Sequence, residues 1–238
     1  MTNVNLFCFP YAGGSAMFYK KWPQVRGEIT VYPVELAGRG SRASDPNYQT
    51  LSQAVDEACN YVELHNAGGP YALFGHSMGG LLAYETACRL VAAGYRGAEH
   101  LFLSSTRCPH EQKRSEPTSH LSDDAFIQKI MDYRGTPDEV FKNKELKEYV
   151  LPILRSDFSI IENHRYEMKQ PIDCPLTILY STNDTVNRED VEPWADKTIQ
   201  DCEFVVYPGT HFYILNYMDE VYSKIVLKLA NAGRLMQY

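Results

Sequence analysis

Short apolar runs of strand length recur along the chain, separated by longer segments whose apolar residues have helical spacing. This alternation predicts an α/β fold in which a mostly parallel sheet is covered by helices on both faces. We expect strands at residues 4–9, 29–34, 71–74, 100–105, 176–181 and 203–207. We expect helices at residues 16–22, 51–65, 81–93 and 213–232.

One long segment interrupts the alternation. Residues 107–170 contain no convincing strand, and their charged, helical character predicts helices near 122–133, 137–141 and 145–163. An insertion at this point would lie above the carboxyl ends of the strands. We predict a lid that shapes a substrate site, the alternative being helices that only add stability. We expect residues 1–238 to form a single domain with this insertion.

Composition and charge exclude some classes of function. The length of 238 residues fits one α/β domain, and the net charge of −7 without a basic cluster argues against nucleic-acid binding. The N-terminus does not resemble a signal peptide, and no apolar run approaches the roughly 18 residues of a membrane span. We therefore expect a cytoplasmic protein without a membrane partner. Six cysteines without C-x-x-C spacing are expected to be unpaired, mostly buried thiols.

The most specific chemical feature is Gly75-His76-Ser77-Met78-Gly79, which follows an apolar run and precedes a helical segment. In that context a Gly-x-Ser-x-Gly sequence is a nucleophile elbow, which holds a serine at the top of an α/β-hydrolase sheet. Glycines flank the serine because the turn strains the backbone and leaves no room for a Cβ. We predict an α/β-hydrolase fold with Ser77 as catalytic nucleophile.

Serine requires a base that is itself oriented by a carboxylate, and the order in elbow folds is Ser, Asp or Glu, His. His211 follows the last expected strand, so its loop can direct the imidazole toward the sheet edge. We predict His211 as the base. His76, inside the elbow, is expected to pack away from the nucleophile. The remaining histidines are expected at the surface or in the lid: His65, His100, His110, His120 and His164.

The acid should follow a strand and precede His211. Asp184 comes directly after the run at 176–181 and is our predicted acid. Asp190 and Asp201 are farther from a strand end and are interpreted as helix-capping or surface charges. Residues 104–106 offer no carboxylate at the earlier strand.

A tetrahedral intermediate requires backbone N–H donors directed at its oxyanion. Met78 follows the nucleophile and is expected to supply one. The second should come from the glycine-containing loop after the first strand, where we favour Ala12 and keep Tyr11 as the alternative. A phosphate-binding loop is disfavoured there, because the spacing and the lysine of such loops are missing.

Four motifs together carry a family resemblance: residues 9–15, 35–40, 74–80 and 209–212. In this order they resemble the type II thioesterases, stand-alone α/β hydrolases that accompany nonribosomal peptide and polyketide synthases. Residues 151–158 are similar to the lid segment of that family. The chain departs from the family pattern at Tyr11, where phenylalanine is frequent, and at residues 35–37, where a proline-containing run is frequent.

The resemblance implies hydrolysis of acyl groups held as thioesters on the phosphopantetheine arm of carrier proteins, either to clear misprimed or stalled synthases or to release intermediates. It implies a monomer with acyl or peptidyl carrier domains as partners. A triad and an oxyanion hole suffice for this reaction, so we expect no cofactor and no metal ligands. The alternatives are a product-releasing thioesterase, a general carboxylesterase, or a non-catalytic carrier-protein binder.

The surface that would meet a carrier protein is less defined by the sequence. Carrier proteins are usually acidic, and this chain is acidic too, so any attraction must be local. Cations in or beside the insertion are candidates, although each of them could equally be ordinary solvated surface. They are Arg107, Lys113, Arg114, Lys142, Lys144 and Lys147.

Overall fold

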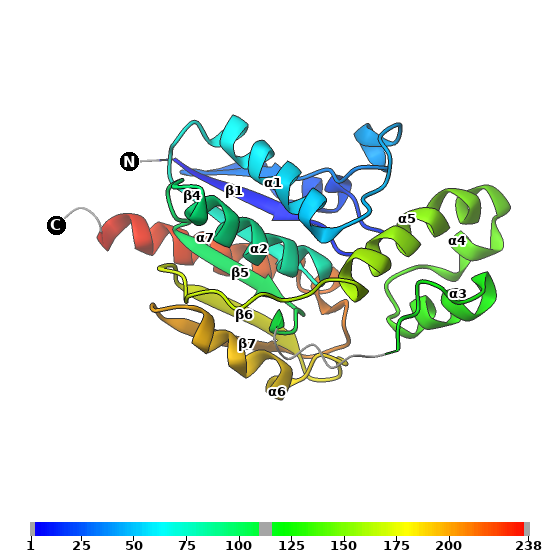
Figure 1. The fold of residues 1–238 in the computed structure, drawn as a ribbon. Coiled ribbons are helices and arrows are strands. Elements are labelled where there is room, and N and C mark those ends of the chain that lie inside the picture. The colour runs from blue at the N-terminus through cyan, green and yellow to red at the C-terminus, as the bar shows by residue number, and fades with distance from the viewer. Residues whose placement is uncertain (1–2, 110–115, 236–238) are drawn as a thin grey trace.

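The computed structural model, which describes residues 3–109 and 116–235, is built on a seven-stranded sheet (Figure 1). The strand order is β2-β3-β1-β4-β5-β6-β7, and every neighbouring pair is parallel except β2 and β3. The predicted α/β-hydrolase fold with a mostly parallel sheet is therefore confirmed. The strands are β1 (Val4–Phe9), β2 (Val25–Arg26), β3 (Ile29–Pro33), β4 (Tyr71–His76), β5 (His100–Ser104), β6 (Leu176–Ser181) and β7 (Cys202–Tyr207).

Helices cover both faces of the sheet. On one face the α-helices are α1 (Leu51–Asn66) and α2 (Met78–Ala92), and on the other is α7 (Met218–Leu235). Shorter helical segments complete the layers around the sheet. They are the 3₁₀ helices η1 (Ala16–Lys21), η2 (Gly40–Arg42), η4 (Glu192–Lys197) and η5 (Tyr213–Leu215), and the single turn α6 (Arg188–Val191).

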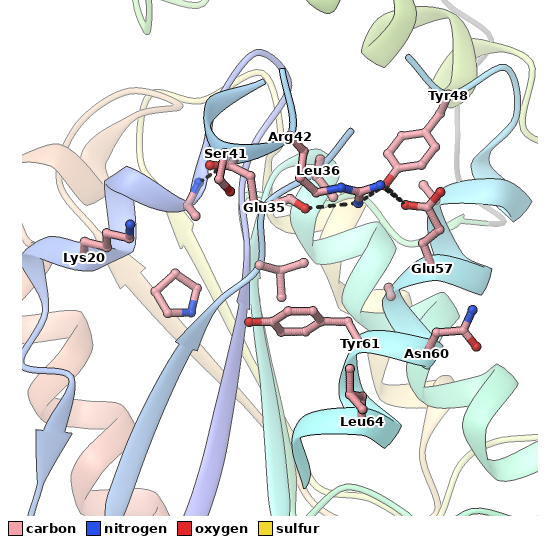
Figure 2. Close-up of a pocket in the computed structure, with 15 residues that line it drawn as sticks. Lys20, Glu35, Leu36, Ser41, Arg42, Tyr48, Glu57, Asn60, Tyr61 and Leu64 are labelled. Atoms are coloured by element: carbon pink, nitrogen blue, oxygen red, sulfur yellow. Dashed lines mark hydrogen bonds and ion pairs between the residues drawn. The ribbon is translucent and has the colours of Figure 1, made fainter. Parts of the chain in front are cut away.

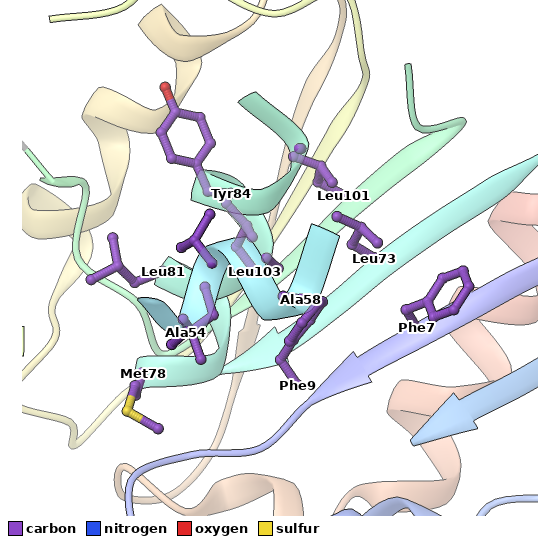
Figure 3. Packing of buried hydrophobic residues seen from close by; sticks show 14 of the residues in the cluster. Phe7, Phe9, Ala54, Ala58, Leu73, Met78, Leu81, Tyr84, Leu101 and Leu103 are labelled. Atoms are coloured by element: carbon purple, nitrogen blue, oxygen red, sulfur yellow. The ribbon is translucent and has the colours of Figure 1, made fainter. Parts of the chain in front are cut away.

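Alternating side chains of the central strands divide the core into two layers. In β1, Phe7 and Phe9 face α1 and α2, whereas Leu6 and Cys8 face η1 and α7. Figure 3 shows the first layer, in which Phe9 packs near Ala58 of α1. Because both faces are covered, the central strands are predominantly apolar, as is typical of a parallel sheet, with Asn5 and Thr177 as polar exceptions in β1 and β6.

The long segment between β5 and β6 contains three helices, α3 (Asp123–Asp132), α4 (Asp138–Lys142) and α5 (Lys144–Glu162). They lie beyond the arrowheads of the strands, at the right of Figure 1. A small apolar cluster of their own includes Phe126, Ile130, Leu151 and Leu154. The insertion thus covers the carboxyl ends of the strands, where the predicted site residues also lie.

The structure differs from the sequence prediction at several elements. The strand β2 was not predicted, because two exposed residues carry no periodic signal. The segment α6–η4 was also missed. The C-terminal helix begins at Met218, not at residue 213, because Tyr213 is buried and its hydroxyl is 2.7 Å from Ser104 Oγ. This anchored turn precedes the helix.

Candidate active site

Ser77 occupies a strained turn between β4 and α2. Its φ of 55° and ψ of −120° lie in a region that residues with a Cβ rarely adopt. The turn is held by the Ser77 N–H, which donates to the Ser104 carbonyl at 2.7 Å. The Thr106 hydroxyl also donates to the Ser77 carbonyl at 2.9 Å. Strain of this kind persists only where the surrounding structure fixes it, as these bonds do here.

The glycines of the elbow are required by close backbone contacts. A Cβ on Gly75 would lie 1.9 Å from the Gly79 carbonyl oxygen. A Cβ on Gly79 would lie 2.2 Å from the carbonyl oxygen of Phe9, in the neighbouring strand β1. Both distances are far below contact, so a side chain at either position would force the elbow away from the sheet.

His211 lies directly beside the serine. Its Nε2 is 2.9 Å from Ser77 Oγ, and its Nδ1 is 2.9 Å from Asp184 Oδ1 and 3.0 Å from Oδ2. This geometry assigns the imidazole proton to Nδ1, leaving Nε2 to accept the proton of the serine hydroxyl. The structure thus brings together the three residues that the sequence singled out.

Asp184 is held as an ion in a nearly closed environment. Its side chain is inaccessible to solvent, and burial alone would raise its pKa. The hydrogen bond to His211 and the N–H of Val186, which donates to Oδ1 at 3.0 Å, outweigh burial and lower the pKa below its ordinary value. A carboxylate in this position can orient an imidazole and stabilise its cation.

The other histidines and acids have different places. His76 is fully buried, and its ring centre lies 5.3 Å from that of His211. Its Nδ1 is 2.8 Å from Ser104 Oγ, and burial lowers its pKa well below the ordinary value. His76 therefore packs as a neutral ring, but beside the candidate base, closer to the site than expected.

Of the remaining histidines, His120 is exposed, as expected. The expectation for His100 was wrong, because it is buried in β5 and its Nε2 lies 2.8 Å from Thr177 Oγ1. His65 and His164 are half-buried. His110 lies outside the described residues.

Asp190 caps α6, where its Oδ2 accepts the Asn187 N–H at 3.0 Å, and Asp201 is exposed. Neither carboxylate contacts His211 through a bond found among the described residues. No disulfide bond joins the cysteines, all of which lie among the described residues: Cys8, Cys59, Cys88, Cys108, Cys174 and Cys202.

The loop after β1 forms a tight turn next to Ser77. The Gly14 N–H donates to the Tyr11 carbonyl at 2.8 Å, and Gly13 has a φ of +75°. The Gly13 N–H donates to Asp157 Oδ2 at 2.7 Å. Across residues 3–109 and 116–235, no acceptor is found for the Ala12 N–H. Met78 begins α2, and the first N–H groups of a helix have no acceptor within it.

Two groups of residues, one at the turn and one beside His211, were not assigned a role from the sequence. Arg39 and Asp157 form a buried ion pair that contacts the turn, and Tyr133 of the insertion packs edge-to-face on His211 with ring centres 5.3 Å apart. Arg39 and Asp157 both lie in segments that carried the family resemblance. Their spacing of 118 positions, however, gave no indication that they pair.

A separate groove of about 600 Å³ lies between α1 and the loop after β3 (Figure 2). Its walls include Glu35, Tyr61 and an exposed network in which Arg42 pairs with Glu57 at 2.7 Å. Neither Ser77 nor His211 lines this groove. Among its polar groups, Arg42, Tyr48 and Glu57 are paired with each other.

None of the helices among the described residues is long and apolar enough to cross a membrane.

Comparison with known proteins agrees with this geometry. A family model described as "Thioesterase domain" matches residues 4–229. The gramicidin S biosynthesis protein GrsT of Aneurinibacillus migulanus is 33% identical over 214 residues, which are 89% of this chain and 83% of that protein.

Two solved structures are similar over almost the whole chain. ClbQ from the colibactin NRPS/PKS pathway has a TM-score of 0.93 and 30% identity, covering 98% of this chain and 100% of that one. The type II thioesterase BorB from the borrelidin biosynthetic cluster has a TM-score of 0.86 and 30% identity, covering 96% and 93%. This chain therefore belongs to the thioesterase family of thioester-hydrolysing enzymes, and its relatives include a type II thioesterase of a biosynthetic cluster.

Proposed function

We propose that this enzyme hydrolyses acyl thioesters held on the phosphopantetheine arm of carrier proteins in a nonribosomal peptide or polyketide pathway. The observation that carries the proposal is the hydrogen-bonded line of Ser77, His211 and Asp184 at the carboxyl end of the sheet. Similarity to proteins such as GrsT and ClbQ supports the class of pathway.

In the first half of the reaction, Ser77 Oγ attacks the thioester carbonyl while His211 Nε2 takes its proton. The N–H groups of Ala12 and Met78 bind the oxyanion of the tetrahedral intermediate. When the intermediate collapses, the carbon–sulfur bond breaks, and the pantetheine thiolate takes the proton from His211. An acyl ester on Ser77 remains.

In the second half, His211 takes a proton from a water molecule, whose oxygen attacks the acyl ester. The second tetrahedral intermediate is bound by the same N–H groups. Its collapse releases the carboxylic acid and returns the proton to Ser77. Asp184 holds the imidazole in the required orientation throughout and stabilises its cationic form. A thiolate leaves readily, so we expect this chain's own residues to suffice without a cofactor.

We propose that the insertion at residues 107–170 acts as the lid of a single domain. Tyr133 lies against both His211 and Phe158, with ring centres 5.3 Å and 6.0 Å apart, so α3 and α5 enclose the reacting residues together. Enclosure of this kind limits the access of water to the reacting residues. A pantetheine arm and its acyl chain would enter between the lid and the strand ends.

The carrier domain is proposed to dock beside the lid of a cytoplasmic monomer. Lys142 and Lys144 are highly exposed, and each has only a loose partner one helical turn away at 3.8 Å. They therefore remain able to meet an acidic carrier. Arg107 is less suited, because its Nε lies 3.3 Å from the buried Asp190. Lys113 and Arg114 lie outside the described residues.

The test compares three acetyl donors: a phosphopantetheinyl carrier protein, acetyl-CoA and a simple aryl ester. Each is measured with the wild-type enzyme and with Ser77→Ala. We expect the carrier-bound thioester to have the highest kcat/KM, and we expect the activity to be lost in Ser77→Ala. A preference for the aryl ester would instead indicate a general esterase. Retention of carrier binding without turnover by the wild-type protein would indicate a non-catalytic binder.

A further inference from the structure

The oxyanion turn at residues 11–14 is joined to the lid by a buried ion pair. We propose that Asp157, fixed by Arg39, positions this turn, so that the docked lid helix α5 holds the Ala12 amide in its productive orientation. Both are positioning residues, because neither contacts Ser77, His211 or Asp184 through a bond found in the described part of the chain. This inference rests on the proposed function, since it assumes that Ala12 is an oxyanion donor.

Asp157 bonds to the turn and to Arg39 at the same time. Its Oδ2 accepts the Gly13 N–H at 2.7 Å and Arg39 Nη1 at 2.6 Å, and its Oδ1 accepts Arg39 Nη2 at 2.7 Å. The bond to Gly13 fixes the peptide plane that directly follows the α-carbon of Ala12. The orientation of the neighbouring Ala12 N–H is therefore restricted by a side chain of the lid.

Arg39 hydrogen-bonds to the other end of the same turn. Its Nη1 also donates to the Gly14 carbonyl at 3.2 Å, and its Nε donates to the Ala37 carbonyl at 3.3 Å. The guanidinium thereby connects the loop after β3, the oxyanion turn and helix α5. Its planar fork suits a bidentate carboxylate and holds both groups in one plane.

Helix α5 also contacts the turn sterically. A Cβ on Gly13 would lie 2.5 Å from Leu154 Cδ2, so the helix packs directly on the backbone of the turn. Leu154 and Asp157 are three positions apart and hence share one face of the helix. Phe158, the next residue, contacts Tyr133, which packs on His211. One helix therefore contacts the surroundings of both the base and the oxyanion donor.

Stability alone does not account for charges at this place. The side chains of Arg39 and Asp157 are 3% and 0% exposed. An apolar pair of similar volume is often as stable as a buried ion pair, because desolvation offsets the attraction between the charges. Only a polar pair, however, can accept the Gly13 N–H and donate to the Gly14 carbonyl. We therefore infer that the two charges are needed to hold the geometry of the turn.

The double variant Arg39→Met with Asp157→Leu removes both charges without leaving one buried and unpaired. We expect kcat for the carrier-bound acetyl thioester to fall about ten- to a hundredfold, since a small displacement of a catalytic group can have this effect. KM is expected to stay within about twofold, because binding of the ground-state thioester does not require the oxyanion donor. The pH profile should keep its shape, because the bonds of His211 are untouched.

An alkyl boronic acid gives a second readout, because its tetrahedral adduct with Ser77 places an oxygen in the oxyanion site. Its affinity should weaken by about the same factor as kcat. Ser156→Ala is the matched control. Ser156 lies on the same helix and donates to the Tyr48 carbonyl at 2.8 Å, which ties the lid to the body away from the turn. This control should retain kcat within about twofold.

A folded double variant with wild-type kcat and boronate affinity would overturn the inference. An equal loss of kcat in Ser156→Ala would also overturn it, because lid docking in general would then be the cause. If the double variant does not fold, Asp157→Asn serves instead, since it keeps the size of the side chain but replaces one of the two oxygens that accept from Gly13 and Arg39; the same readouts apply. Failure of the proposed function is distinguishable, because the wild-type enzyme would then prefer the aryl ester or would not turn over the carrier-bound thioester.

Discussion

His211 Nε2 lies 2.9 Å from Ser77 Oγ, although 134 positions of sequence separate the two residues. Their strands, β4 and β7, are not neighbours, so the loop after β7 must extend over the ends of β5 and β6. Two serines support it there. Ser105 Oγ donates to the His211 carbonyl at 3.3 Å, and Ser181 Oγ donates to the Thr210 carbonyl at 2.8 Å. Residues that follow or end β5 and β6 thus hold the loop that places the base beside the nucleophile.

Replacing Asp184 by asparagine tests the proposed acid. Asp184→Asn should lower kcat by about 10⁴, as in a serine protease, because the amide favours the wrong tautomer of His211. Steady-state turnover of an acyl thioester measures the effect. The matched control is Asp190→Asn, which alters a carboxylate that caps α6. The control should lower the unfolding free energy by about 1 kcal/mol and leave kcat nearly unchanged. A reversal of the two results would move the acid to Asp190.

Replacing Met78 by leucine tests whether the oxyanion donor is a backbone group. Met78→Leu keeps the N–H and nearly conserves the volume of a side chain that is 2% exposed. We expect a loss of kcat of less than about tenfold, far below the loss in Ser77→Ala, since the donor at this position is part of the main chain. Acylation by a chromogenic thioester compares the two variants. Equal losses would show that the methionine side chain itself participates.

Acid stability should depend on two buried histidines. Burial lowers the pKa of His100 to about 4 and lowers the pKa of His76 well below its ordinary value of 6.5. Between pH 6.5 and 4 the unfolded chain therefore binds more protons at these sites than the folded chain. The contribution of these histidines to the unfolding free energy is fully present above pH 6.5. It is lost as the pH falls, by about 1.4 kcal/mol per pH unit for each histidine.

The variant His100→Gln isolates one of these contributions. Glutamine can keep a hydrogen bond to Thr177 without binding a proton, so its stability curve should be flatter than that of the wild type between pH 6.5 and 4. Urea unfolding at a series of pH values gives both curves. Parallel curves would mean that His100 is not neutral and buried in the folded protein.

A methyl group at Gly79 should disrupt the elbow. The added Cβ of Gly79→Ala would lie 2.2 Å from the Phe9 carbonyl oxygen, which is main chain and cannot turn aside. We expect the unfolding free energy to fall by at least about 3 kcal/mol, or the protein not to fold. Gly97→Ala is the control, because its Cβ would meet nothing closer than 3.9 Å. Denaturant unfolding measures the unfolding free energy of both variants. A stable Gly79→Ala protein would contradict the close packing of α2 on β1.

The fold was largely predictable from local patterns. The runs at β1, β5 and β6 are short and mostly apolar, and α1 has one apolar face and begins with a Thr50–Gln53 capping box. These signals depend only on near neighbours in the sequence. The expectation for His100 was wrong because its burial depends on β6, which supplies Thr177 as its partner. Tertiary partners of this kind leave no local pattern.

Some residues of the candidate site could likewise be predicted from the sequence, and others could not. Ser77, Asp184 and His211 could be named because each follows a strand, and parallel strands end at one edge of the sheet. The sequence by itself therefore determined the sheet, the elbow and the order of the proposed reacting groups. Only the tertiary structure decided that Arg39 pairs with Asp157 and that Tyr133 covers His211. These contacts depend on how the inserted helices pack over the strand ends, which no periodicity along the chain encodes.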